Sequence, residues 1–247
     1  MLSKTLDSLC KLHLHGMAQE LQQQMERGTA LDLSFEERLD LLVTREVLRR
    51  EDRSLTRRLK VAHFKVTARL EDVDYRHPRG LIRKVVQNLA TCEWVFARRN
   101  VVITAATGLG KTWLACAFGD KACRDGYTAI YRRVPRLTHE LAVARADGSY
   151  LKLLQQLART DLLVLDDWGM NPLEGQAQHD LLEVIDDRLG LRSTIVTSQL
   201  PVGQWHDHIA DATVADALLD RLLQPATIIT LKGESMRKPA KSEDTPA

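Results

Sequence analysis

The 247-residue sequence has few aromatic residues, few cysteines and no long apolar run. A membrane-spanning helix needs about 20 predominantly apolar residues in succession, so the sequence predicts no membrane contact. The first residues lack the pattern of a secretory signal. The four cysteines show no CxxC spacing, which indicates reduced, buried, structural thiols. Together these features predict a cytoplasmic protein.

An excess of charge of one sign is also missing. Lys and Arg total 35, Asp and Glu total 33, and the net charge is +2. This balance excludes a histone-like basic protein and an acidic solvating chain. A hydrophobic fraction of 44% with 28% charged residues is typical of a globular chain of one or two domains.

The small net charge conceals one strongly basic segment. Residues 49–69 contain eight basic and two acidic residues, a local charge of +6, so the rest of the chain sums to −4. On a helix, the apolar residues of this region share one side: Leu48, Leu55, Leu59, Ala62 and Val66. Five basic residues fall on the opposite side: Arg49, Arg50, Arg53, Arg57 and Lys60.

Two interpretations of this basic face are open. A charged helix face is often simply solvated. Alternatively, the face contacts the phosphate backbone of a nucleic acid. Because the aromatic content of 5% argues against stacking on single-stranded bases, the second interpretation favours duplex DNA.

The spacing of apolar residues changes along the chain. Residues 1–70 show helical spacing only and predict a small all-α domain, followed by a connector over residues 71–99. In residues 100–238, β-branched segments alternate with helical ones, which predicts an α/β domain with a five-stranded parallel sheet flanked by helices. The expected strands are residues 100–104, 128–131, 162–166, 193–197 and 227–231. The polar residues 239–247 predict a disordered tail.

The first expected strand runs into the segment Ala-Ala-Thr-Gly-Leu-Gly-Lys-Thr at residues 105–112. A strand, a glycine-rich loop with Lys-Thr and a following helix form a P-loop, although a glycine-containing turn is the ordinary alternative. We expect Lys111 to reach the β- and γ-phosphates of ATP and Thr112 to bind Mg²⁺. Ala105 replaces the usual first glycine, which costs energy if that position needs a positive φ or a close approach of phosphate. The expected nucleotide-binding residues are Ala105, Thr107, Gly108, Leu109, Gly110, Lys111, Thr112 and Trp113.

Polar residues also follow two later strands. Asp166 and Asp167 end a buried strand, at the sheet edge where α/β proteins bind ligands. We expect Asp166 to hold Mg²⁺ and Asp167 to act as the general base on the attacking water, with a helix cap as the alternative. Ser198 and Gln199 end the next strand, either to sense the γ-phosphate or as a polar turn before Pro201.

The chain resembles the IstB family, the AAA+ helper ATPases of bacterial insertion sequences, which are related to the helicase loader DnaC. The resemblance covers residues 1–238 and departs at Ala105 and Ala106, where the family has Gly-Pro. That departure bears on ATP turnover more than on nucleotide binding. The matching segments are residues 107–115, 163–169, 197–201, 219–222 and 232–237.

The resemblance implies a bacterial, DNA-associated ATPase that uses Mg²⁺. Its subunits would form a ring or spiral on duplex DNA through the helical domain and the AAA+ domain, remodel target DNA and recruit or activate a partner transposase. ATP hydrolysis would then dismantle the assembly. Ser198 and Gln199 match the first sensor, Arg237 the second sensor, and Arg221 the arginine finger that reaches a neighbouring subunit.

Further basic residues and other functions leave alternatives open. A local helix salt bridge is the alternative for Arg221. Arg132, Arg133 and Arg136 follow the second expected strand, either on a DNA-facing surface or in a solvated loop. A helicase loader has the same fold with a different partner. A nucleotide-binding DNA scaffold with impaired hydrolysis is the third hypothesis, and Ala105 is its motivation.

Overall fold

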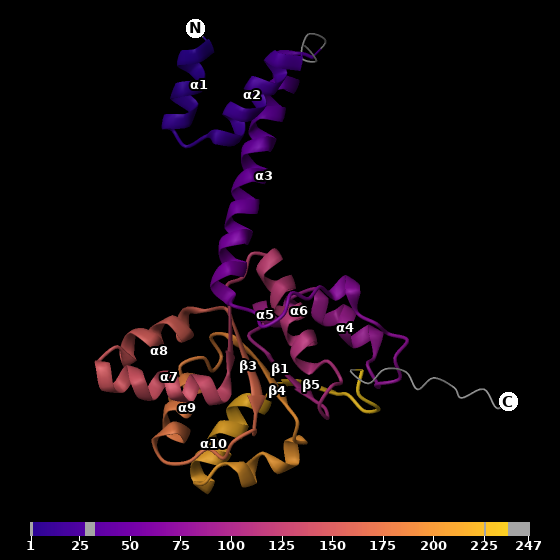
Figure 1. Ribbon diagram of the computed structural model, residues 1–247, viewed down its shortest axis with the longest axis vertical. Coiled ribbons are helices and arrows are strands. Elements are labelled where there is room, and N and C mark those ends of the chain that lie inside the picture. The colour runs from indigo at the N-terminus through magenta and orange to yellow at the C-terminus, as the bar shows by residue number, and fades with distance from the viewer. Residues whose placement is uncertain (1, 28–32, 225, 237–247) are drawn as a thin grey trace, which may run out of the picture. The chain divides into compact units, whose positions relative to one another are not determined.

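The computed structural model describes residues 2–27, 33–224 and 226–236 (Figure 1). The chain divides into two compact units, Met1–Arg57 and Arg58–Ala247. The expected sensor Arg237 and the expected disordered tail lie outside the described residues. In the part of the chain that is described, no helix combines the length and the apolarity needed to cross a bilayer.

The first unit is helical, as predicted, with α1 (Leu2–Lys11), α2 (His15–Arg27) and most of α3 (Phe35–Ala62). Ser34 and Glu37 form a capping box at the start of α3, because each side chain accepts a hydrogen bond from the other residue's backbone N–H. The buried Glu46 accepts a 2.6 Å hydrogen bond from the backbone N–H of Gly16. This contact joins α3 to the beginning of α2.

The expected basic face of α3 is exposed along its whole length, from Arg49 to Lys60. The apolar side is less regular: Ala62 is buried, whereas Leu48 is 50% exposed. The helix ends at Ala62, and the next residue, His63, has a positive φ of 52°. Val66 therefore does not continue the apolar stripe, contrary to the prediction. A left-handed residue interrupts the helical hydrogen bonds before that position.

The boundary between the units also differs from the predicted domain limit at residue 70. Residues 58–70 and the expected connector, residues 71–99, fall within the second compact unit. Arg58 donates a 2.8 Å hydrogen bond to the carbonyl of Cys123, and the ring of Phe64 lies where a Cβ on Gly119 would fall. The segment also contains α4 (Arg83–Ala90) and α5 (Glu93–Phe96). Because these contacts are long-range, local periodicity could not reveal them.

The second unit is built on a five-stranded parallel sheet in the order β2-β3-β4-β1-β5, which confirms the predicted α/β fold. The strands are β1 (Asn100–Thr104), β2 (Ala129–Arg133), β3 (Leu162–Trp168), β4 (Ser193–Ser198) and β5 (Ala226–Thr230). Each expected strand is present. β2 and β3 end two residues later than expected, and this extension brings Arg132 and Arg133 into β2 itself.

Helices cover both faces of the sheet (Figure 1). They are α6 (Lys111–Arg124), α7 (Val134–Asp147), α8 (Tyr150–Arg159), α9 (Gln176–Asp186) and α10 (Ala212–Leu223). Val102 of β1 packs in one apolar core with residues of α7, α9 and α10. Successive residues of a strand point to opposite faces, and α6 packs on the other side. All residues of β1 and β4 are accordingly buried.

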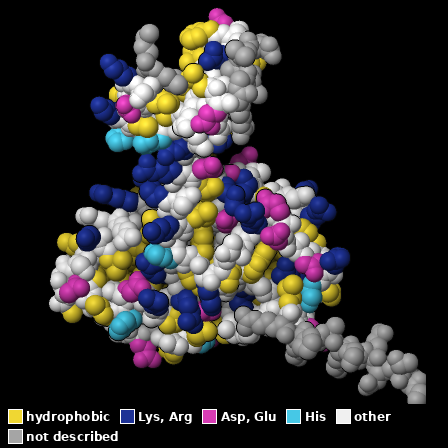
Figure 2. Space-filling model, turned by 45° about the horizontal axis from the view of Figure 1, so that its top comes forward, with side chains coloured by type: hydrophobic (Ala, Val, Ile, Leu, Met, Phe, Trp, Pro, Cys, Tyr) yellow, Lys and Arg dark blue, Asp and Glu magenta, His cyan; other side chains and the backbone are white. Residues whose placement is uncertain are grey.

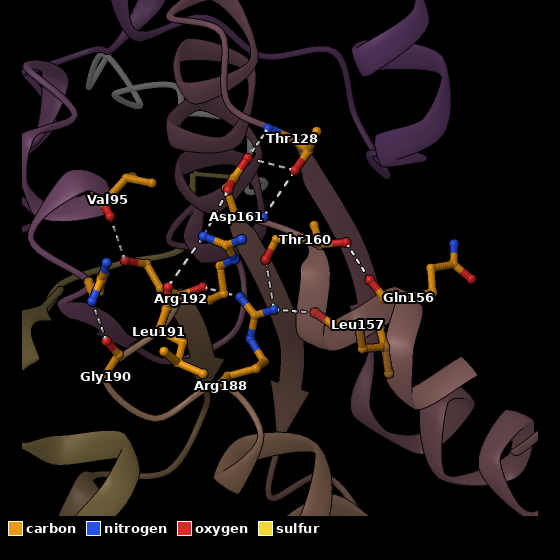
Figure 3. Close-up of polar contacts among 12 residues, drawn as sticks. Val95, Thr128, Gln156, Leu157, Thr160, Asp161, Arg188, Gly190, Leu191 and Arg192 are labelled. Atoms are coloured by element: carbon orange, nitrogen blue, oxygen red, sulfur yellow. Dashed lines mark hydrogen bonds and ion pairs between the residues drawn. The ribbon is translucent and has the colours of Figure 1, made fainter. Parts of the chain in front are cut away.

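A buried arginine ties together the amino-terminal edge of the sheet. Arg188 is 1% exposed and donates to the carbonyls of Leu157, Thr160 and Ser193 and to the Thr194 hydroxyl. Figure 3 shows this network, with Arg192 beside Asp161. Burial lowers the pKa of Arg188 to about 9. Its acceptors belong to α8, β4 and the turn before β3, so one side chain connects three elements.

The cysteines follow the prediction in part. Cys92, Cys116 and Cys123 are buried free thiols, whereas Cys10 on α1 is exposed. The surface drawn in Figure 2 carries both Lys and Arg side chains and Asp and Glu side chains, in keeping with the small net charge.

Candidate nucleotide-binding site

A cavity of about 730 Å³ opens at the carboxyl edge of the sheet, where the P-loop joins β1 to α6. Most of the expected nucleotide-binding side chains line it. The loop contributes Thr107, Gly108, Gly110, Lys111, Thr112 and Trp113. Other parts of the second unit contribute Lys65, Val66, Thr67, Asp72, Asp74, Arg79, Arg133, Asp167, Met170, Gln199 and Met236.

The loop backbone has the conformation that its glycines allow. Gly108 and Gly110 have φ values of 89° and 86°, and α6 starts directly after Gly110. Ala105, in contrast, has a negative φ and donates a 3.1 Å backbone hydrogen bond to the carbonyl of Ser198. The strain that a positive φ would impose on Ala105 is therefore absent, because an L-residue adopts this conformation readily.

Lys111 lies within the loop. It is 8% exposed, and its Nζ donates to the carbonyls of Ala105 and Ala106 at 2.7 and 2.9 Å. The ammonium group is thus held over the glycine-rich turn at the wall of the cavity. A phosphate group in the loop would compete with neutral carbonyl oxygens for this cation, and a charged acceptor forms the stronger hydrogen bond.

The structure brings together the two expected magnesium ligands. The Thr112 hydroxyl lies 2.9 Å from each carboxylate oxygen of Asp166, which is fully buried. A hydroxyl beside a carboxylate is the kind of oxygen donor pair that Mg²⁺ uses together with phosphate oxygens and water. The residues present therefore fit the ion.

Two further hydroxyls bind Asp166 that the sequence analysis did not identify. Tyr131 of β2 donates to it at 2.5 Å, and Thr197 of β4 donates from the other neighbouring strand. Burial, together with the hydrogen bond to Asp166, raises the pKa of Tyr131. A polar side chain within an otherwise apolar buried strand was the available signal. These contacts fix the carboxylate from both sides.

Asp167 has a different environment from Asp166. Its backbone is left-handed, with φ 61°, and its carboxylate accepts a 2.6 Å hydrogen bond from Nε of Arg133. This contact raises the pKa of Arg133. Arg133 lines the nucleotide cavity and ends β2, so it does not lie in a loop after that strand, and its DNA contact stays a prediction. The strand extends to Arg133, and parallel pairing sets this residue opposite the end of β3.

The other two arginines of that set are paired as well. Arg132 donates to Glu140 at 2.9 Å, and Arg136 donates to the same carboxylate group at 3.2 Å. Arg132 lies in β2 and Arg136 in the first turn of α7. One acid on α7 therefore offsets part of the positive charge of both residues.

The two expected sensor residues at the end of β4 have different contacts. Gln199 lines the cavity, and its Oε1 accepts a 2.8 Å hydrogen bond from the hydroxyl of Thr107 in the P-loop. Ser198 is buried, donates to the carbonyl of Trp168 and accepts from the backbone N–H of Leu200. The Ser198 hydroxyl thus braces the end of β3, whereas Gln199 reaches the nucleotide loop.

Arg221 is not among the residues that line the cavity. In α10 it donates to Asp186 of α9 at 2.5 Å and to the carbonyl of Ala217 at 3.0 Å. The alternative considered for Arg221, a salt bridge, is therefore present, but it joins two helices instead of lying within one. The described contacts of Arg221 therefore do not reach the P-loop of its own subunit.

Comparison with known proteins identifies the family to which the chain belongs. The model of the family described as "IstB-like ATP binding protein" matches residues 7–244. The chain belongs to this family. An insertion sequence ATP-binding protein of Sinorhizobium fredii is 50% identical to this IstB-like protein over 234 residues, which is 95% of this chain and 96% of the relative. The ATP-binding protein of insertion sequence IS1162 of Pseudomonas fluorescens is 51% identical over 202 residues, 81% of this chain and 87% of the relative.

A solved structure shows which fold the IstB-like protein has. The crystal structure of the DnaC helicase loader is similar to it with a TM-score of 0.56 and 20% identity, covering 67% of this chain and 97% of that chain. The fold is thus the α/β P-loop fold of AAA+ proteins, as the resemblance implied. ATP binding is the property by which the family and both relatives are described.

Proposed function

We propose that this IstB-like protein is a magnesium-dependent ATPase that assembles on duplex DNA and recruits or activates the transposase of its insertion sequence. ATP hydrolysis then ends the assembly. The observation that supports the ATPase most directly is the contact of Thr112 with both oxygens of the buried Asp166. It brings the P-loop and the end of β3 into the arrangement that nucleotide hydrolysis needs.

Each residue of the site has a role that follows from its surroundings. Thr112 and Asp166 would hold Mg²⁺, which when bound neutralises charge on the phosphate oxygens. Lys111 exchanges its carbonyl acceptors for phosphate oxygens and stabilises the charge that develops on them. Asp167, once separated from Arg133, accepts a proton from the attacking water at its carboxylate. Gln199 orients that water from the opposite side of the loop.

The proposed DNA contact rests on the exposed basic face of α3. Arg49, Arg53, Arg57 and Lys60 project from one side of the helix and are exposed. Arg50 shares that side but donates to Glu46 at 2.7 Å, so it offers less charge to DNA. A helical row of exposed cationic side chains suits the regular spacing of duplex phosphates, and it reads no base sequence.

The proposed assembly rests on Arg221, which does not line the nucleotide cavity of its own subunit. Nucleotide hydrolysis by this class commonly uses an arginine supplied from a neighbouring subunit. Arg221 is 27% exposed on its side chain and is tied to Asp186, away from its own P-loop. Exchange of Asp186 for a neighbour's γ-phosphate would couple hydrolysis to assembly on DNA.

A phosphate-release assay tests this proposal. Turnover should require Mg²⁺, rise when duplex DNA is added, and be lost in Lys111→Ala. Lys121→Ala is the matched control, because Lys121 lies on the same helix and pairs with Asp125 at the surface. Absence of turnover by the wild-type protein, with and without DNA, would favour a nucleotide-binding scaffold instead. Co-purification with the transposase or with a replicative helicase distinguishes the transposition helper from a loader.

A further inference from the structure

Arg79 is a buried cation in the turn before α4 that the sequence analysis did not identify. It is 2% exposed and lines the nucleotide cavity. Its Nη1 donates to the carbonyl of Leu109 in the P-loop at 2.9 Å and lies 3.2 Å from Sδ of Met236. Its Nη2 donates to the carbonyl of Asp74 at 3.3 Å. Among the described residues, the buried Nε has no hydrogen-bond partner.

No carboxylate of the described residues forms an ion pair with this guanidinium. The acidic neighbour that attracts it is Asp74, whose side chain pairs with Arg76 and whose pKa is lowered mainly by the backbone N–H of Arg76. Burial lowers the pKa of Arg79, because the loss of hydration of the charged form outweighs the attraction of Asp74. A buried ion in this situation destabilises the protein unless a partner supplies the opposite charge.

Arg188 provides an internal comparison, because it is equally buried. Three carbonyls and one hydroxyl satisfy the guanidinium of Arg188, which lies far from the cavity at the amino-terminal edge of the sheet. Arg79 has two carbonyls, a weakly accepting sulfur and one orphan nitrogen. The described residues therefore satisfy the hydrogen-bonding groups of Arg188 but leave those of Arg79 partly unsatisfied.

The backbone around Arg79 holds the guanidinium against the phosphate loop. A Cβ added to Gly110 would fall 2.7 Å from its Nη1. The carbonyl of Arg79 accepts from the backbone N–H of Lys232 at 2.9 Å, and the N–H of Met236 donates to the carbonyl of Gly108 at 3.0 Å. Because both sides of the turn are fixed, Arg79 cannot readily leave the loop for solvent.

We propose that Arg79 is a second cationic residue of the nucleotide site and that the phosphates of a nucleoside polyphosphate supply its missing counter-charge. Lys111 and Arg79 then both attract phosphate groups bound in the P-loop. Lys111 belongs to the loop, and Arg79 is held against it by its hydrogen bond to the carbonyl of Leu109. The proposal rests on the proposed nucleotide function and deepens it. It assigns part of the discrimination between polyphosphates and monophosphates to a turn outside the P-loop.

The experiment compares Arg79→Gln and Arg79→Lys with the wild-type chain. Displacement of a fluorescent ADP gives the Kd for ATP, ADP, AMP and adenosine. Arg79→Gln should weaken ATP and ADP binding about 10-fold or more, weaken AMP less and leave adenosine unchanged, as loss of a charge-assisted interaction predicts. Arg79→Lys keeps the charge and should stay within about 3-fold of wild type. Arg76→Gln is the matched control, an exposed arginine of the same turn, and should not change any of the four.

Thermal unfolding separates this role from a purely structural one. Arg79→Gln should leave the Tm of the nucleotide-free protein unchanged or raise it, because an uncompensated buried charge is removed, while the rise in Tm on adding ATP becomes smaller. A lowered nucleotide-free Tm with an undiminished ATP response would show that Arg79 only braces Leu109 and would overturn the proposal. Equal weakening of adenosine and ATP, or unchanged ATP affinity, would overturn it as well. Failure of the wild-type chain to bind ATP would instead refute the proposed function itself.

Discussion

The hydroxyl of Thr112 lies 2.9 Å from both carboxylate oxygens of Asp166, although 54 residues separate them in the sequence. The contact joins the start of α6 to the end of β3. Hydroxyls of Tyr131 and Thr197 approach the same carboxylate from the two strands that flank β3. A fully buried carboxylate is thus held by three hydroxyl donors from three different elements.

Replacement of this carboxylate should abolish catalysis without unfolding the protein. Asp166→Asn keeps the volume of the side chain and removes its charge, so it should reduce magnesium-dependent phosphate release at least 100-fold, an effect of about 2.7 kcal/mol. Circular dichroism checks the fold. Asp125→Asn, which changes an exposed acid paired with Lys121, should retain wild-type turnover. Substantial turnover by Asp166→Asn would contradict the assignment of this residue to the metal site.

The ion pair of Arg133 with Asp167 makes a separate prediction. Arg133→Gln releases the Asp167 carboxylate and should raise phosphate release several-fold in the absence of DNA, whereas Asp167→Asn should lose it. Arg132→Gln is the control, because that neighbour pairs with Glu140 instead. If Arg133→Gln falls to the level of Asp167→Asn, Arg133 supports catalysis and does not restrain it.

The basic face of α3 predicts a loss of DNA affinity that depends on salt. Arg53→Glu combined with Arg57→Glu should weaken binding to duplexes of any sequence. The slope of log affinity against log salt should fall by up to about 1.8, since each lost phosphate contact contributes about 0.9. Fluorescence anisotropy at several salt concentrations measures both quantities. Lys152→Glu with Arg159→Glu introduces the same charge change on exposed positions of α8. An unchanged slope in the α3 variant would exclude that face as the contact.

The exposure of the four cysteines predicts how many of them react with a thiol reagent in the native protein. Burial raises the pKa of Cys92 and of Cys123 to about 12 and also raises the pKa of Cys116. At pH 8 these groups are therefore protonated in the folded protein, and the thiolate that reacts with disulfide reagents is scarce. One equivalent, from the exposed Cys10, should react quickly in the native state and four after denaturation in urea. Rapid reaction of more than one thiol in the native protein would show that the core around α6 opens.

Much of the fold followed from local patterns. The strand 100–104 was located to the residue, because buried β-branched residues precede a glycine-rich loop of known geometry. The nucleotide residues Lys111 and Thr112 were identified from the same segment. The end of β2 was placed two residues early, since Arg132 and Arg133 are charged and look like a loop. Parallel pairing with β3 keeps them in the strand.

Sequence alone determined the fold class, the phosphate loop and the strand that carries Asp166, because each depends on residues that are neighbours in the chain. Tertiary structure decided the contacts that tune the site: Tyr131 on Asp166, Arg133 on Asp167 and Arg79 beneath Leu109. Each of these pairs joins residues 30 to 35 positions apart. Local periodicity does not predict such pairs, because strand order, register and packing bring the two residues together only in the folded domain.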